Sequence, residues 1–325
     1  MASLLKLRTG ASMPAIGFGT WQASDSELEA ALDAALEAGY RHIDTAYVYE
    51  NEAAIGRVLA KWLNSGKVQR EDLFIVTKLP PTGNHPDRVE KYLKRSLDKL
   101  GLDYVDIYLV HVPFGFLEKD EEIHPLDADG NILLDKSTNH VDIWKAMEVQ
   151  VDAGRTKAIG LSNFNISQIK RVLQSAHIPP ANLQVELHVL CQQRELVDFC
   201  KEHDIIVCAY SPLGSRGTAQ LYKAVGISKD FPDLMNNSTV LEIAKQHAKT
   251  PAQILLRHIV QRGMAAIPKS TNSERIRQNL QVHDFELSSE DMASLDKLDQ
   301  GSAGRILDFG FFKGIKNHPE YPFQQ

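Results

Sequence analysis

"LFIVTKLPPTGNHPDRVEKYLKRSLDKLGLDYVDIYLVHV", residues 73–112, contains a complete strand–helix–strand pattern. Its two ends, residues 73–79 and 105–112, are apolar runs rich in β-branched residues, which favour strands. Residues 87–101 between them form an amphipathic helical pattern, and Gly101 stands where a helix C-cap needs a left-handed residue. Apolar strands joined through a helix are typical of α/β proteins.

The same alternation continues along nearly the whole chain. Further strands are predicted at 14–20, 41–46, 157–163, 183–188, 205–213 and 264–270. Helical patterns lie between them, at 25–39, 141–154, 167–176 and 194–204. Eight strands, each followed by a helical stretch, are the count for a (β/α)8 barrel. A doubly wound sheet is the competing architecture, but no G-x-G-x-x-G motif opens a helix after the first strand, which favours the barrel.

The connections between these elements predict how the barrel is closed. Residues 4–8 are expected to pair with 13–17 as a hairpin across its N-terminal end, and no linker divides residues 1–325, so we expect one domain.

Three segments exceed ordinary βα connections and are interpreted as walls of one pocket at the C-terminal face. They are residues 113–140, residues 214–237 and the aromatic tail, 300–325, which we interpret as a substrate-pocket loop.

The composition narrows the class of protein. Among 325 residues, 36 Lys and Arg stand against 42 Asp and Glu, and the net charge of −6 argues against nucleic acid or an anionic membrane as partner. The N-terminus lacks a signal-peptide core, and no stretch approaches the roughly 20 apolar residues that span a bilayer. Three cysteines without metal-type spacing indicate reduced thiols, so we expect a soluble, cytoplasmic protein.

Polar residues stand at the C-terminal ends of the predicted strands, where a barrel places its active site. Asp44 and Tyr49 follow the second strand, and Lys78 and His111 end the third and fourth. Taken singly, each residue has a structural explanation. Asp44 could cap a helix and Tyr49 could be an interface phenol. Lys78 could extend its charged end from the strand into solvent, and His111 could be a core histidine. Together, four ionisable groups converge on one rim. The remaining strands end in Thr20, Trp21, Ser162, Asn163, Gln184, His188, Tyr210, Ser211, Lys269 and Ser270.

Asp44, Lys78, Tyr49 and His111 form a set suited to delivering a proton. A phenol with a pKa of about 10 is a poor donor at neutral pH, and a nearby ammonium group lowers that pKa. An aspartate keeps the lysine charged, and an imidazole can hold and polarise a carbonyl oxygen. No nucleophile paired with a base and no metal-ligand set stands out in the sequence, so no metal is expected.

Five motifs occur in fixed order: GFGTW (17–21), HIDTAYVYENE (42–52), TKL (77–79), IGLSNF (159–164) and IPKST (267–271). In order and spacing they resemble the aldo-keto reductases, and the resemblance extends to YPF at 321–323. It implies a monomeric, NADPH-dependent reductase of small-molecule carbonyl compounds on a (β/α)8 barrel. The family's catalytic tetrad maps to Asp44, Tyr49, Lys78 and His111, with Tyr49 as proton donor and His111 orienting the carbonyl.

The resemblance also implies a coenzyme site. Ser162, Asn163 and Gln184 would suit the nicotinamide carboxamide, and Tyr210 would suit stacking on the ring. The implied contacts together are Gly19, Thr20, Trp21, Asp44, Ser162, Asn163, Gln184, Tyr210, Ser211, Leu213, Ser215, Lys269, Ser270, Arg275 and Asn279.

The choice of coenzyme is tied to the start of the last barrel helix. Lys269, Ser270 and Arg275 offer two cations and a hydroxyl group there, which suits the 2′-phosphate of NADPH. The structural alternative is a capping box formed by Thr271 and Glu274, with the charges on a solvated face. Asn279 also matches a position near the adenine, whereas Gln278 replaces the glutamate that relatives commonly carry.

The substrate pocket departs from several aldose-reducing relatives. Those relatives carry tryptophan at the positions of Pro80 and Val112, and smaller residues here open the site. The expected lining is Trp21, Val48, Tyr49, His111 and Phe114, with Phe116 and the tail aromatics as further candidates. A roomy, apolar pocket predicts bulky hydrophobic carbonyl compounds, such as ketosteroids, rather than open-chain sugars.

Other functions remain open at this point. An aldose-type reductase of small carbonyl compounds fits the same motifs. A Schiff-base barrel would use Lys78 as nucleophile, but this needs a lowered lysine pKa, and Asp44 would raise it. A non-catalytic NADPH-binding sensor fits the scaffold, although all four tetrad residues are present.

Overall fold

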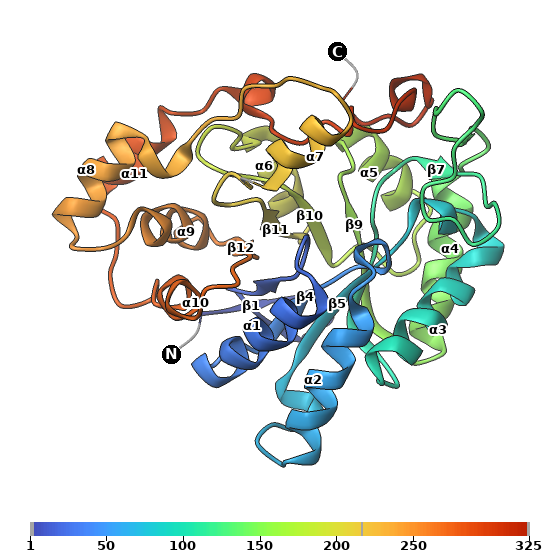
Figure 1. Ribbon diagram of the computed structural model, residues 1–325, viewed down its shortest axis with the longest axis horizontal. Helices are drawn as coiled ribbons and strands as arrows, with labels where there is room; N and C mark the ends of the chain where they lie inside the picture. Colours follow the sequence, from blue (N-terminus) through green and yellow to red (C-terminus); the bar gives the residue numbers. More distant parts are fainter. Residues whose placement is uncertain (1–2, 216, 324–325) are drawn as a thin grey trace.

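The computed structural model describes residues 3–215 and 217–323, and its centre is a barrel of eight parallel strands (Figure 1). The strands pair in chain order, and a parallel bridge between Ile16 and Ala266 joins the last to the first. The predicted (β/α)8 barrel is confirmed. The strands are β3 (Phe18–Gly19), β4 (His42–Asp44), β5 (Phe74–Leu79), β6 (Val105–Val110), β9 (Thr156–Ser162), β10 (Asn182–Glu186), β11 (Ile206–Tyr210) and β12 (Ala265–Ala266).

Helices surround this barrel, as the alternating pattern predicts (Figure 1). The ring contains α1 (Asp25–Ala38), α2 (Glu52–Asn64), α3 (Val89–Leu100), α4 (His140–Asp152), α5 (Ile166–Leu173), α6 (Arg194–Glu202), α9 (Pro251–Gln261) and α10 (Ser273–Leu280). Gly101 ends α3 with a φ of 66°, a conformation that glycine adopts without strain. Outside the ring lie α7 (Gly217–Ala224), α8 (Ser238–Gln246) and α11 (Ser289–Asp296).

The expected N-terminal hairpin is also present. Strand β1 (Leu4–Lys6) pairs antiparallel with β2 (Ser12–Pro14). Leu7 and Met13 pack against apolar side chains inside the barrel, among them Phe74, Val76, Ile107, Leu109 and Ala265. The hairpin therefore closes the N-terminal end of the barrel with buried apolar side chains. Because side chains alternate along a strand, Phe74 and Val76 of β5 face inward together with Lys78.

The first and last barrel strands are shorter than predicted. Regular pairing covers only Phe18–Gly19 and Ala265–Ala266, although strands were expected over 14–20 and 264–270. The backbone nevertheless closes the barrel, because Gly17 N donates to Ala266 O at 2.9 Å and Gly19 N to Pro268 O at 3.2 Å. A side chain at Gly19 would meet the carbonyl oxygen of Ile267, so this seam requires glycine.

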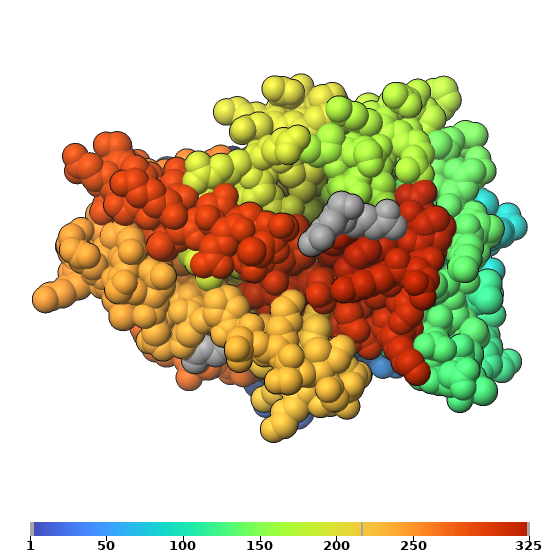
Figure 2. Space-filling view, turned by 90° about the horizontal axis from the view of Figure 1, so that it is seen from above, coloured from blue at the N-terminus to red at the C-terminus, as the bar shows by residue number. Residues whose placement is uncertain are grey.

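Three long segments cover the C-terminal ends of the strands. Residues 113–140 contain a hairpin of β7 (Gly115–Phe116) and β8 (Leu134–Asp135), and residues 214–237 contain α7. Figure 2 shows the tail crossing this face beside both of these segments. Up to residue 323 the tail has only short helical turns, Gly301–Gly304 and Ile315–Asn317.

Buried hydrogen bonds fix the tail at both ends. The Glu186 carboxylate, at the end of β10, accepts from the backbone N–H groups of Ile306 at 2.6 Å and Leu307 at 2.7 Å. Further along, the His318 ring lies 2.8 Å from the carbonyl oxygen of Asp135, and Glu320 pairs with Arg171 of α5. The aromatic residues between these anchors are thereby held over the barrel.

The three cysteines are free and buried, in line with the expected reduced thiols. Burial raises the pKa of Cys191 and of Cys200 to about 12, so these thiols are poor nucleophiles at neutral pH. No helix within residues 3–215 and 217–323 combines the length and apolar composition needed to cross a bilayer.

Candidate active site

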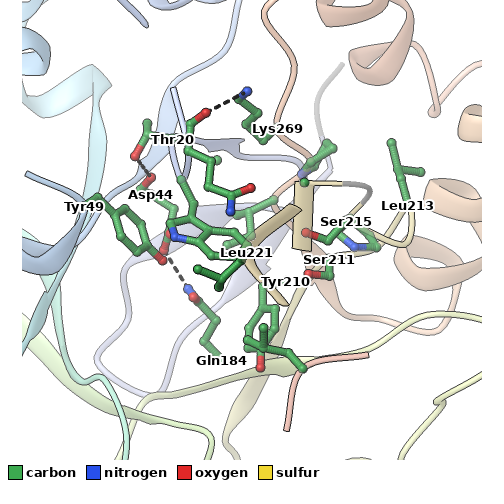
Figure 3. A pocket seen from close by; sticks show the side chains of 18 of the residues that line it. Thr20, Asp44, Tyr49, Gln184, Tyr210, Ser211, Leu213, Ser215, Leu221 and Lys269 are labelled. Carbon is green, nitrogen blue, oxygen red and sulfur yellow. Dashed lines mark hydrogen bonds between the residues drawn. The ribbon is translucent and has the colours of Figure 1, made fainter. Parts of the chain in front are cut away.

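A cavity of about 800 Å³ opens at the C-terminal ends of the strands, beneath the three long segments. It brings together nearly every residue singled out from the sequence. In Figure 3, Tyr49, Asp44 and Gln184 lie on one side and Ser211, Leu213 and Ser215 on the other. The predicted residues that line it are Gly19, Thr20, Trp21, Asp44, Val48, Tyr49, His111, Ser162, Asn163, Gln184, Tyr210, Ser211, Leu213, Ser215, Lys269, Ser270, Arg275 and Asn279.

Lys78 is fully buried next to this cavity and links two of the lining residues. Its ammonium group donates to Asp44 Oδ1 at 2.6 Å, to the carbonyl oxygen of Thr45 at 2.9 Å and to the Tyr49 hydroxyl at 3.5 Å. All three ammonium hydrogens thus have acceptors, which a buried charge requires.

Asp44 is fixed by both of its carboxylate oxygens. Oδ1 binds Lys78, and Oδ2 accepts from Gln184 Nε2 at 2.6 Å. Asp44 is not a helix cap, since α2 begins only after Asn51. The alternative raised from the sequence, that Asp44 only caps the next helix, is therefore wrong.

The charges within this set oppose the effects of burial. Burial favours a neutral Lys78 and is the largest single effect on its pKa, but Asp44 and Tyr49 together outweigh it, and the pKa of Lys78 is raised. A Schiff-base lysine needs the opposite change, so this ion pair disfavours an aldolase-type role. Burial raises the pKa of Tyr49, and Lys78 lowers it by less. The expectation of a lowered Tyr49 pKa is therefore wrong for the protein alone, because the sequence does not reveal how deeply the phenol is buried.

His111 faces Tyr49 edge to face, with ring centroids 5.7 Å apart. Its Nδ1 atom is buried and, within the described residues, has no hydrogen-bond partner. Burial places the pKa of His111 well below its usual value, and the charge of Lys78 acts in the same direction. The imidazole is thus neutral at neutral pH and can donate a hydrogen bond without carrying a charge.

A second group of polar residues lies beside the tetrad. Asn163 donates to the carbonyl oxygen of His111 at 2.9 Å, and the Tyr210 hydroxyl donates to Asn163 Oδ1 at 2.7 Å. Asn163, Ser211 and Ser215 have φ values of 65°, 51° and 38°, a region that non-glycine residues seldom adopt. Such strained conformations cluster at ligand-binding sites.

The far end of the cavity carries the cations expected from the sequence. Lys269 and Arg275 form no salt bridge within residues 3–215 and 217–323, and the Lys269 ammonium donates only to a backbone carbonyl oxygen, that of Gln22, at 3.4 Å (Figure 3). Helix α10 is capped by Asn272, whose side chain accepts from Arg275 N at 2.9 Å. The alternative capping box of Thr271 and Glu274 is therefore wrong. Two such cations at a helix N-terminus fit an anionic group.

The opposite end is apolar and aromatic. Val48 and Val112 line it together with residues of the tail, namely Leu307, Phe309, Phe311 and Phe312. Phe114, an expected lining residue, is instead fully buried under Phe309, with ring centroids 5.3 Å apart. Phe116 lies similarly behind Phe312. Because Phe114 directly precedes β7 and Phe116 belongs to it, both lie in a second layer that supports the wall.

Sequence reasoning missed some of the lining. His124, Leu221 and Met235 all reach the cavity from the long segments. The sequence identified those segments as walls, but their elements are short, as in α7, and do not show from a pattern alone which side chains face inward. Conversely, His188 ends the strand predicted over 183–188, but β10 stops at Glu186, and His188 lies outside the cavity, buried 3.0 Å from Glu186.

A barrel with this buried Asp–Lys–Tyr set at its mouth defines a class of carbonyl-reducing enzymes. The chain belongs to the aldo-keto reductase family, and the model of the Aldo/keto reductase family matches residues 15–300. It is accordingly an oxidoreductase that acts on carbonyl compounds, in a family that generally uses NADP(H).

Individual relatives match along essentially the full chain. Aldo-keto reductase family 1 member A1 of Mus musculus is 45% identical over 327 residues, covering 99% of this chain and 98% of the relative. Aldo-keto reductase family 1 member C15 of Rattus norvegicus is 40% identical, with 98% and 96% covered. The solved aldose reductase from Schistosoma japonicum superposes with a TM-score of 0.89 at 41% identity, covering 99% of each chain.

Proposed function

We propose that this chain reduces bulky, hydrophobic aldehydes and ketones to alcohols with NADPH, and that Tyr49 donates the proton. The observation that carries the proposal is the continuous chain of buried hydrogen bonds from Gln184 through Asp44 and Lys78 to Tyr49. It ends at a hydroxyl group that lines the cavity. When bound, NADPH supplies the hydride that the carbonyl carbon receives.

The roles of the side chains follow from their charges. The raised pKa keeps the proton on the Tyr49 hydroxyl until a substrate oxygen becomes strongly basic. When Tyr49 gives up this proton, the ammonium group of Lys78, 3.5 Å away, stabilises the phenolate that remains. Neutral His111 donates a hydrogen bond to the same carbonyl oxygen and holds it near Tyr49.

The coenzyme would lie along the polar side of the cavity. Ser162, Asn163 and Gln184 offer amide and hydroxyl groups for the carboxamide, and Tyr210 offers a ring for stacking. Lys269, Ser270 and Arg275 would hold the 2′-phosphate, which makes NADPH the preferred coenzyme over NADH. The unpaired state of both cations within the described residues supports this assignment.

The shape and lining of the opposite end support large apolar substrates, of which ketosteroids are one class. The similarity to a solved aldose reductase favours a second candidate, reduction of small aldehydes and aldoses. We also propose that the chain acts as a single-domain, cytoplasmic monomer, which is supported by the barrel built from most of its length and by three free thiols.

The test is NADPH consumption by the purified protein with a ketosteroid, an aromatic aldehyde and glucose. We expect turnover of the steroid and the aldehyde, with the highest kcat/KM for the bulky substrate. A clear preference for glucose would replace this assignment by the aldose-type one. Tight NADPH binding without any turnover would indicate a coenzyme sensor.

A further inference from the structure

One histidine interrupts the aromatic wall of the substrate end. His124 lies in residues 113–140, between β7 and β8, and lines the cavity. Its ring is tilted by 45° against that of Phe312, with centroids 5.0 Å apart. Among residues 3–215 and 217–323 its ring nitrogens have no hydrogen-bond partner, and its ring packs against Phe312, so its polar atoms are free to bind a ligand.

His124 lies on the side of the cavity that contains the tetrad. It is close enough that its charge, when present, would lower the pKa of His111. The carboxylate of Glu50, the residue that directly follows Tyr49, in turn acts to raise the pKa of His124. Tyr49, His111 and His124 line the same cavity, so a substrate whose carbonyl oxygen lies between Tyr49 and His111 shares that cavity with the His124 ring.

The surroundings of His124 offer few other hydrogen-bonding groups. The tail residues that line the cavity, Leu307, Phe309, Phe311 and Phe312, are aliphatic or aromatic, so they offer a substrate no polar side-chain atoms. An apolar substrate gains nothing from an imidazole at this position. A second oxygen on the substrate would replace its lost hydration by a hydrogen bond to this ring.

The charges at and around His124 favour a neutral oxygen atom of the substrate over a charged one. Although His124 is exposed at the cavity wall, the surrounding protein atoms lower its pKa through desolvation, and Glu50 offsets this only in part. The ring is therefore neutral at neutral pH, with one donor and one acceptor nitrogen. It can bind a carbonyl or a hydroxyl oxygen, whereas the nearby Glu50 carboxylate disfavours an anionic group.

We propose that His124 is a specificity-determining residue that hydrogen-bonds a second, neutral oxygen of the substrate. The preferred substrates are then hydrophobic carbonyl compounds with an additional keto or hydroxyl group. The proposal rests on the proposed reductase function and names the substrate class of the same site.

The experiment compares substrates that differ only in the second oxygen. One pair is phenylglyoxal and phenylacetaldehyde, and the other is dihydrotestosterone and the same ketosteroid without its hydroxyl group. We expect His124→Phe, which keeps an aromatic ring against Phe312, to lower kcat/KM about fivefold for the two-oxygen member of at least one pair. The one-oxygen members should be unchanged or improved, and His124→Gln should recover part of the loss.

Two controls separate the possible results. Phe311→Leu alters the same wall without removing a hydrogen-bonding atom and should affect both members of each pair alike. Unchanged NADPH affinity, followed by tryptophan fluorescence, shows that the variants fold. If His124→Phe changes both members of both pairs in equal proportion, the inference is overturned while the proposed function stands. If the unaltered protein reduces none of the four compounds, the proposed function itself fails.

Discussion

Lys78 and Asp44 form an ion pair of 2.6 Å between two side chains that are almost completely excluded from solvent. Burying two charges is costly, and the pair is tolerated because each partner is also hydrogen-bonded elsewhere, Lys78 to Thr45 O and Asp44 to Gln184. The arrangement keeps a positive charge 3.5 Å from the Tyr49 hydroxyl. The fold thus keeps an energetically costly buried ion pair at the position where the proposed reaction needs a positive charge.

Asp44→Asn should destabilise the protein, because it leaves the Lys78 ammonium group buried without a counter-charge. The expected loss is about 3 kcal/mol in the free energy of unfolding, measured by urea titration. Adding Lys78→Met to this variant should recover part of the loss, since the unpaired charge is then removed. Equal stability of Asp44→Asn and the unaltered protein would show that the pair is not a buried ion pair in solution.

Glu52 predicts a pH dependence of stability that is unrelated to catalysis. It is buried in α2, where Thr77 donates to its Oε1 at 2.6 Å and its Oε2 has no hydrogen-bond partner within the described residues. Burial raises its pKa. The folded state therefore retains a proton that the unfolded state has lost, so this contribution is present at low pH and is lost as the pH rises above about 4.5.

Glu52→Gln is neutral at every pH and should remove this loss. As the pH rises from about 4 to about 8, the unfolding free energy of the Glu52→Gln variant should therefore increase relative to that of the unaltered protein. Glu71→Gln, at an exposed position, is the control and should show no such shift. A pH-independent difference for Glu52→Gln would contradict a raised pKa.

The hydrogen bonds between Glu186 and the tail predict that a residue which does not contact the substrate can alter the affinity for it. Glu186→Gln keeps one acceptor oxygen and so loses one of the two backbone hydrogen bonds to Ile306 and Leu307. The tail is then less well fixed, and KM for a bulky ketone should rise about tenfold while the Kd for NADPH stays the same. Glu202→Gln, on the exposed face of α6, is the matched control. Parallel changes in KM and coenzyme Kd would point to general unfolding instead.

Arg275 predicts the discrimination between the two coenzymes. Removing its charge by Arg275→Met should weaken NADPH binding about tenfold or more, because a charge-assisted hydrogen bond to phosphate is lost. NADH, which lacks that phosphate, should bind as before. Arg277→Met, on the same helix but paired with Glu274, serves as the control. Equal losses for NADPH and NADH would rule out a 2′-phosphate contact.

The sequence predicted the features that depend on local patterns and on the order of the strands. The eight strands, the hairpin of β1 and β2 and the convergence of Asp44, Tyr49 and Lys78 all follow from apolar periodicity and from the rule that strand ends meet at one face. Barrel geometry converts positions in the sequence into positions in space, so these residues could be found before the structure.

Features set by packing depth could not be predicted in this way. Phe114 and His124 lie in the same long segment, yet the first is buried and the second lines the cavity. Only the path of the loop around β7 and β8 decides this. Likewise, the direction of the Tyr49 pKa depends on the balance between burial and the charge of Lys78, and burial is not visible in the sequence.

Tyr49→Phe tests the central claim most directly, because it removes one oxygen atom and leaves the ring that packs against His111. The measurement is kcat for NADPH-dependent reduction of an aromatic aldehyde, together with the Kd for NADPH. We expect kcat to fall by about a hundredfold or more, as for loss of a general acid, with the Kd unchanged. Turnover close to that of the unaltered protein would contradict Tyr49 as the proton donor.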